Sequence, residues 1–107
     1  MKLSNAECNV LDSVASSTKM DCWFFITEDK NGRPYIFDLE NNKRMRIEHA
    51  VQQLMEGIEE PINYYNCRLT EKEDAILRDL AKRCGAILPP TIEESKRCFE
   101  EAYGKKN

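Results

Sequence analysis

The sequence predicts one α+β domain that combines a three-stranded antiparallel meander with about four helices, in the order α-β-β-β-α-α-α. Residues 22–27 and 35–39 are rich in aromatic and β-branched side chains, which is typical of strands. No helical pattern separates these two runs, so we expect the strands to pair antiparallel. Three other segments carry the S/T-x-x-E pattern of a helix N-terminus, and they begin at Ser4, Thr70 and Thr91.

The first helix is predicted over residues 5–17. Apolar side chains recur there at three- and four-residue steps, which places them on one helix face. These side chains are Leu3, Ala6, Val10, Leu11 and Val14. The Ser16-Ser17-Thr18 cluster predicts the end of the helix, because such side chains compete for backbone hydrogen bonds.

The first hairpin is predicted at Asn31-Gly32, since both residues tolerate the positive φ angles of a two-residue type I′ turn. That turn places Ile26 opposite Phe37 and Phe24 opposite Leu39. The other face of the sheet would then carry Trp23, Phe25, Thr27, Ile36 and Asp38.

A third strand is predicted after a loop at residues 41–43. A three-residue loop brings opposite charges together across the strands, whereas a two-residue loop would place arginines opposite apolar side chains. The expected pairs are Leu39 with Met45, Phe37 with Ile47, Glu40 with Arg44, and Asp38 with Arg46.

The second half of the chain is predicted to contain three helices, at residues 48–56, 71–83 and 92–103. Gly57 would end the first of them in a left-handed conformation, and Gly85 would close the second. The intervening residues 61–69 are interpreted as a crossing loop that buries apolar groups. We expect a single globular domain over residues 1–107, with a disordered tail at residues 104–107.

The bulk properties argue for a cytoplasmic protein with no membrane segment, metal or cofactor. The longest apolar run, Trp23 to Ile26, is far too short for a membrane span, and no apolar stretch follows Lys2 as in a secretory signal. The five cysteines are odd in number and at least fourteen residues apart, which fits neither a disulfide framework nor a zinc site. We interpret the only histidine, His49, as a solvent-facing helix residue, and we expect no catalytic activity.

Residues 69–81, LTEKEDAILRDLA, resemble the opening helix of helix-turn-helix domains, which often reads LTxxExxILxxLA. The resemblance covers thirteen residues and implies a tight turn followed by a recognition helix. Instead, the helix predicted after residues 85–90 carries four glutamates, which would repel phosphates, and the sequence pI is near 5.2. We therefore do not expect nucleic acid as the main partner. A nucleic-acid-associated regulator is kept as the alternative, with the cations Arg33, Lys43, Arg44, Lys96 and Arg97 as its contact set.

Aromatic residues concentrate in the predicted hairpin, because five of the nine in the chain lie between residues 23 and 37. One face of the sheet would form an exposed apolar patch unless the first or the last helix packs on it. Exposed patches of this kind bind protein partners or a second copy of the chain. The main hypothesis is a small non-catalytic protein-interaction module, with a homodimer as one form of that interaction. The predicted contact residues are Trp23, Phe25, Ile36 and Asp38.

Overall fold

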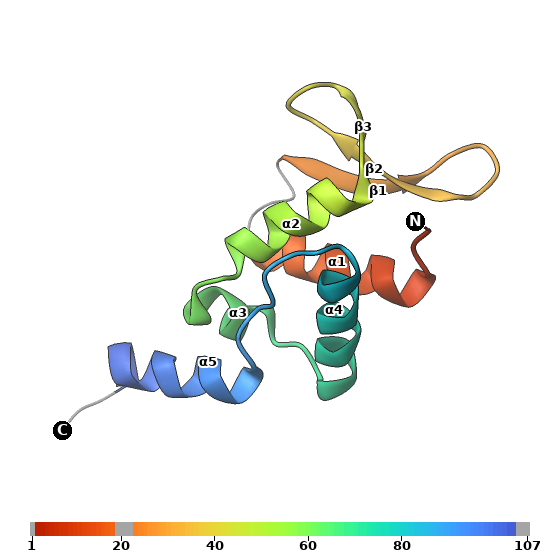
Figure 1. Cartoon of the computed structure of the whole chain (residues 1–107). Coiled ribbons are helices and arrows are strands. Elements are labelled where there is room, and N and C mark those ends of the chain that lie inside the picture. The colour runs from red at the N-terminus through yellow and green to blue at the C-terminus, as the bar shows by residue number, and fades with distance from the viewer. Residues whose placement is uncertain (1, 19–22, 105–107) are drawn as a thin grey trace.

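The computed structural model describes residues 2–18 and 23–104, and within them it contains five α-helices and one three-stranded antiparallel sheet (Figure 1). The helices are α1 (Asn5–Ser17), α2 (Ile47–Gly57), α3 (Pro61–Cys67), α4 (Glu71–Arg83) and α5 (Ile92–Phe99). The strands are β1 (Phe24–Glu28), β2 (Pro34–Asp38) and β3 (Lys43–Met45), and a π-helical turn, η2 (Glu100–Gly104), follows α5. The α+β class and the meander order β1-β2-β3 are confirmed.

All three helix starts that the capping pattern predicts are confirmed. At α1 the Ser4 hydroxyl accepts from the Glu7 backbone N–H at 3.1 Å, and the Glu7 carboxylate accepts from the Ser4 N–H at 2.9 Å. The same reciprocal pair occurs at the starts of α4 and α5. Helices α1 and α4 match their predicted ranges residue for residue, and Gly85 follows α4 with φ +69° as expected.

The prediction of a loop at residues 61–69 is wrong, because Pro61–Cys67 forms the helix α3. Proline is favoured in the first turn, where its missing N–H costs nothing, and this short helix buries Tyr64 and Cys67 at a three-residue step. The left-handed stop expected at Gly57 is also wrong, since Gly57 is the last residue of α2 and has no positive φ. Helix α5 and η2 together cover the predicted helix at residues 92–103. The predicted disordered tail at residues 104–107 lies outside the described residues except for Gly104.

The register of β1 and β2 differs by one residue from the prediction, because the hairpin turn is longer. Phe24 pairs with Asp38, and Ile26 pairs with Ile36. The Asp29 N–H donates to the Arg33 carbonyl at 3.0 Å, and the Asp29 carboxylate accepts from the backbone N–H groups of Asn31 and Arg33. This makes a three-residue loop with Gly32 at φ +75°, the usual turn when a left-handed glycine comes third.

The register of β2 and β3 also differs from the prediction. The observed pairs are Ile36 with Met45, Phe37 with Arg44, and Asp38 with Lys43. The Asp38 carboxylate accepts from the N–H groups of Glu40 and Asn41 and from the Asn41 side-chain amide, at 2.8 to 3.1 Å. Because Asp38 is occupied in shaping this loop, the expected charge pairs Glu40–Arg44 and Asp38–Arg46 do not form.

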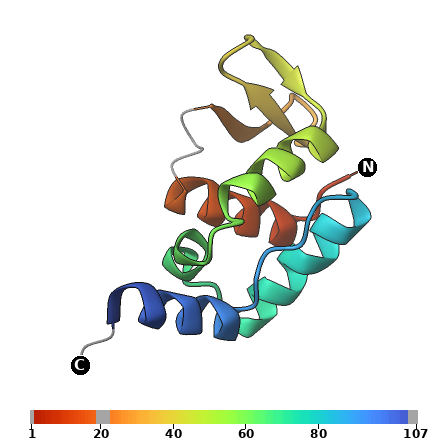
Figure 2. The same cartoon turned by 60° about the vertical axis from the view of Figure 1, so that its left-hand side comes forward.

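The core lies between one face of the sheet and the helices below it (Figure 2). Phe24 and Ile36 of the sheet join one buried cluster with side chains of α1, α2 and α4, including Leu11, Val14, Val51, Leu54, Leu77 and Leu80. The molecule measures 56 × 26 × 20 Å, and the sheet and α5 lie at its opposite ends.

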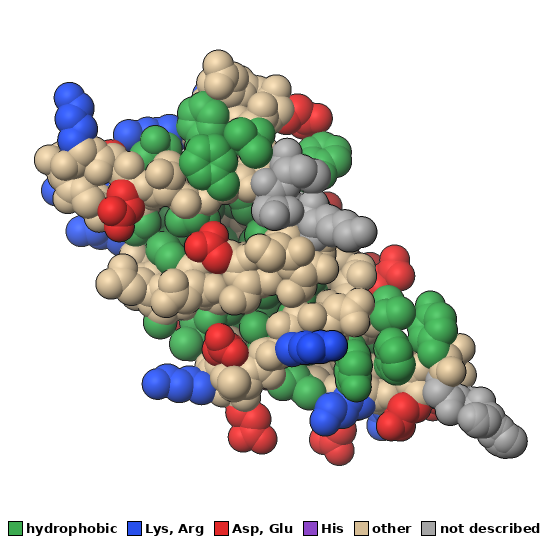
Figure 3. Space-filling view, turned by 180° about the vertical axis from the view of Figure 1, so that it is seen from behind, with side chains coloured by type: hydrophobic (Ala, Val, Ile, Leu, Met, Phe, Trp, Pro, Cys, Tyr) green, Lys and Arg blue, Asp and Glu red, His purple; other side chains and the backbone are tan. Residues whose placement is uncertain are grey.

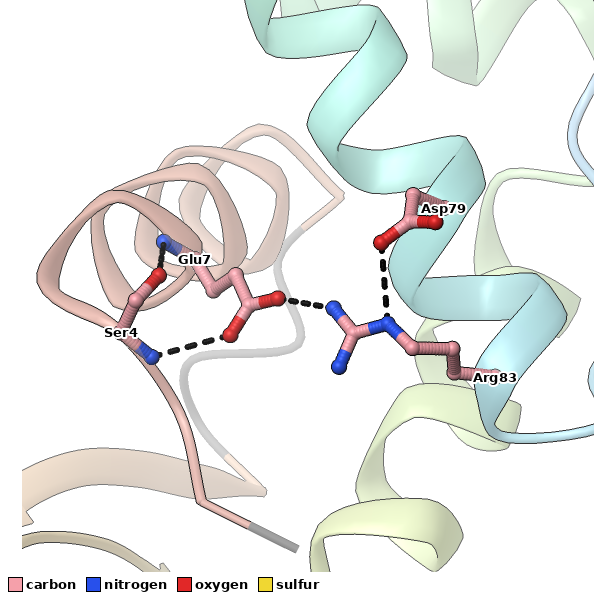
Figure 4. Close-up of polar contacts among 4 residues, drawn as sticks. All are labelled: Ser4, Glu7, Asp79 and Arg83. Atoms are coloured by element: carbon pink, nitrogen blue, oxygen red, sulfur yellow. Dashed lines mark hydrogen bonds and ion pairs between the residues drawn. The ribbon is translucent and has the colours of Figure 1, made fainter.

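A polar bridge fastens α1 to α4 (Figure 4). The Arg83 guanidinium of α4 contacts the Glu7 carboxylate of the α1 capping box, and its Nε donates to Asp79 at 2.9 Å. Burial alone would raise the pKa of Glu7, but the hydrogen bond from the Ser4 N–H and the contact with Arg83 outweigh it and hold that pKa below its ordinary value. The same carboxylate therefore caps one helix and ties it to another.

Candidate interaction surface

The candidate site is the face of the sheet that points away from the helices. Because strand side chains alternate between faces, the neighbours of buried Phe24 and Ile36 point outward. The Leu39 N–H donates to the Trp23 carbonyl at 2.8 Å, which extends the β1–β2 pairing by one step. We call the outward set the outer sheet face, and its members are Trp23, Phe25, Thr27, Tyr35, Phe37, Leu39 and Arg44.

Large apolar side chains are exposed on the outer sheet face. Trp23 is 48% exposed, Phe25 42% and Leu39 44%. Phe37 lies beside Phe25, with ring centroids 5.7 Å apart and the planes tilted by 41°. Hydrophobic side chains gather over the sheet and, separately, at the α5 end of the molecule (Figure 3). The outer sheet face therefore presents aromatic side chains that none of the described helices covers.

The arginine on this face is held in place by an aromatic ring. The Arg44 guanidinium lies over the Tyr35 ring, 4.0 Å from its centroid, which is a cation–π arrangement. No carboxylate belongs to the seven residues of the outer sheet face. Tryptophan, tyrosine and arginine are the residues that most often dominate protein-binding energy, so the composition is that of an interface centre.

Two of the four predicted contact residues lie on the other side of the sheet. Ile36 is 1% exposed and packs in the core, and Asp38 is buried beneath the loop that it shapes. Hydrogen bonds from the side chain and the backbone of Asn41 hold the pKa of Asp38 below its ordinary value. Trp23 and Phe25 are placed outward as predicted, and the prediction missed Tyr35 and Phe37. The signal for the correct register was the aspartate two residues before Asn31, which anchors the longer turn.

The cations of the nucleic-acid alternative do not come together. Arg33 lies in the β1–β2 hairpin loop and Lys43 and Arg44 lie on β3, whereas Lys96 and Arg97 lie on α5 at the other end of the molecule (Figure 1). A helix-turn-helix pair is not formed either. Residues 84–91 separate α4 from α5, and α5 packs on α3, with the Tyr65 and Phe99 rings stacked at 4.7 Å.

The histidine and cysteine side chains that could act in catalysis are not arranged as a catalytic group in the described residues. His49 is exposed on α2. Burial raises the pKa of the Cys67 thiol to about 11 and also raises the pKa of Cys8, which disfavours the reactive thiolate. Within the described residues, no group of three or more His, Cys, Asp or Glu side chains is placed to hold a metal ion. In the same part of the chain, every helix is too short or too polar to cross a membrane.

Compared with protein families, characterised proteins and solved structures, the chain matches none of them. Its function must therefore be argued from its own surface, and the outer sheet face is the feature that most resembles a recognition surface.

Proposed function

We propose that the protein is a non-catalytic interaction module of the cytosol that binds a protein partner through the outer sheet face. The observation that carries this proposal is the joint exposure of Trp23, Phe25 and Leu39 on the uncovered side of a sheet whose other side is the core. A contiguous apolar surface of this kind lowers the solubility of a protein unless a partner covers it. Free thiols at Cys8, Cys67 and Cys98 fit a reducing compartment such as the cytosol.

The structure of the face suggests how binding would be stabilised. Its aromatic side chains stand on a hydrogen-bonded sheet, so little conformational entropy remains to be lost when a partner orders them. Trp23 and Phe25 lie at the free edge strand β1, where a partner can reach them from the side as well as from above. These two rings are the expected energetic centre of the interface.

The positive charge of the outer sheet face indicates which kind of protein surface it can bind. Arg44 is the only ionic side chain among the seven, since the adjacent Lys43 points to the opposite side of β3. Contact between two copies of this face would add a second Arg44 and no carboxylate from the seven residues to pair with either. The face therefore favours a different protein, with an apolar surface that carries an aspartate or glutamate within reach of Arg44.

The experiment compares partner capture by the wild-type chain with capture by the double variant Trp23→Ser/Phe25→Ser. Ile87→Ser is the matched control, because Ile87 is an exposed apolar residue between α4 and α5 that lies beside Met55 and Glu56 of α2 and does not belong to the outer sheet face. The captured protein is identified by mass spectrometry, purified and titrated against all three chains. We expect the double variant to lose binding and the control to keep it. Arg44→Gln should weaken binding and reduce its dependence on salt.

Three results would overturn the proposal or redirect it. Retention of the partner by the double variant removes the outer sheet face as the site. A doubled solution mass that the double variant abolishes would identify a second copy as the occupant instead. Salt-sensitive binding of random single-stranded RNA, lost in the same variant, would show that the aromatic rings stack on bases.

A further inference from the structure

A separate hollow lies between α3 and α5, at the end of the molecule opposite the sheet. It has a volume of about 370 Å³, and its lining residues are Tyr64, Tyr65, Arg68, Leu69, Ile92 and Lys96. This volume is within the range of sites that hold small molecules. The hollow is independent of the outer sheet face, so the proposed function does not account for it.

The lining of the hollow carries positive charge only. Arg68 and Lys96 approach it from the end of α3 and from α5, and no carboxylate lines it. Among the described residues, neither cation forms an ion pair. The Arg68 N–H donates to the Tyr65 carbonyl at 3.2 Å, which fixes the Arg68 backbone beside the aromatic wall. Two unpaired cations in one concave site of an acidic protein would attract an anion.

One residue that lines the hollow is a buried tyrosine. Tyr64 is 2% exposed, and its hydroxyl has no hydrogen-bond partner among the described residues. Buried tyrosine hydroxyls usually find a partner, because leaving one unpaired is costly. The other buried side-chain atoms without a partner in the described part of the chain are Asp74 Oδ1 and Arg78 Nη2 of α4 and Ser95 Oγ of α5, and none of these residues lines the hollow. Tyr64 is thus the one lining residue with a buried polar atom that has no partner among the described residues.

The remaining surface of the hollow is apolar and rigid. Tyr65 is stacked on Phe99, which in turn contacts Tyr103 at 5.3 Å between ring centroids. Leu69 is buried and Ile92 half-buried, so they complete an apolar floor. A flat hydrocarbon body would fit against these side chains.

We infer that this hollow binds a small organic anion, a flat apolar body that carries a carboxylate or a phosphate monoester. Arg68 and Lys96 bind the acid group, and the body packs against Tyr65 and Ile92. The class of ligand follows from the pairing of cations with aromatic surface, since a purely polar anion would leave the apolar side chains unused.

The test is a titration of the ¹⁵N-labelled full chain, followed by amide chemical shifts. Benzoate and phenyl phosphate represent the two acid groups, benzamide is the neutral counterpart, and inorganic phosphate is the anion without a body. We expect saturable shifts in α3 and α5 with both aromatic anions, at dissociation constants below about 1 mM. Benzamide and inorganic phosphate should bind at least about tenfold more weakly. The Trp23 indole N–H, at the far end, should not move.

Variants identify the groups responsible. Arg68→Gln/Lys96→Gln should weaken both aromatic anions by about tenfold or more, whereas Lys30→Ala, which removes an exposed cation from the hairpin, should have no effect. Equal binding of benzoate and benzamide, insensitivity to the double variant, or affinities weaker than about 1 mM for both aromatic anions would each overturn the inference.

Discussion

The register of the first hairpin decides which residues can bind a partner, and two substitutions test it directly. In the structure Ile36 is 1% exposed, whereas Phe25 is 42% exposed. Removal of a fully buried isoleucine side chain costs about 2 to 5 kcal/mol in lost burial and cavity formation. Phe25→Ala should cost about 1 to 1.5 kcal/mol, because only about half of that ring leaves water on folding. Ile36→Ala is therefore expected to be the more damaging change although it removes the smaller side chain.

The assay is urea unfolding followed by far-ultraviolet circular dichroism. With a slope of about 1.5 kcal/mol per M, Ile36→Ala should lower the midpoint by about 1 to 3 M and Phe25→Ala by less than about 1 M. Partner binding should respond in the opposite order, with Ile36→Ala retaining it under folding conditions and Phe25→Ala losing it. Equal losses of stability, or a larger loss for Phe25→Ala, would refute the observed register and restore the pairing expected from a two-residue turn.

Three further predictions address the helices and the thiols. Because the folded-state pKa of Glu7 is depressed, the stability that its charge contributes is present above about pH 4.5 and is lost as pH falls through the folded pKa. Glu7→Gln should lower the unfolding free energy by up to about 1 kcal/mol at about pH 6, because the pair is partly exposed. This difference from wild type should shrink as the pH falls to about 3. A difference that grows in acid would contradict the contact between Glu7 and Arg83. In native protein at about pH 8, iodoacetamide should label Cys98 before Cys67, because burial raises the pKa of Cys67 to about 11. Peptide mass spectrometry measures the order of labelling, and faster labelling of Cys67 would contradict this prediction. Gly85→Ala should lower the unfolding free energy by about 1 kcal/mol, because alanine is strained at φ +69° and the added methyl group would contact no other atom. Gly85→Asn should cost less, because asparagine adopts this conformation more readily. Equal costs in thermal unfolding would argue against a left-handed cap.

The helices were predictable where the sequence carries a local signal. Each capping box involves two residues three positions apart, so its geometry needs nothing from the rest of the chain. The boundaries of α1 and α4 follow from such boxes and from Gly85. Helix α3 was not predictable in this way, because it has no side-chain cap and its seven residues are too few to show a periodic stripe. Its helical state depends on burying Tyr64 against the rest of the fold.

The candidate site was predictable only in part, because an error of one residue in the length of the hairpin loop changes which side chains of β2 point outward. A loop one residue longer exchanges the two faces of β2 while leaving β1 unchanged. Trp23 and Phe25 were therefore placed correctly, whereas Ile36 and Asp38 were exchanged for Tyr35 and Phe37. The Asn31-Gly32 signal identifies a turn but not its length, which depends on whether the Asp29 carboxylate can accept the two N–H groups inside it.

The hollow between α3 and α5 could not be found from the sequence, because it is assembled across residues 64 to 96 around a helix that local signals do not show. Once α3 is in place, its relation to the sheet is constrained by α1, which packs against β1, α3 and α4. Between the hollow and the sheet lie α1, which contacts both α3 and β1, and a second path through α4 and α2, since Arg78 of α4 lies over the Tyr64 ring and α2 packs on β2. Sites this far apart with no shared contacts are usually independent in free energy. The outer sheet face and the hollow are therefore best treated as two separate binding surfaces of one elongated domain, each open to mutation without loss of the other.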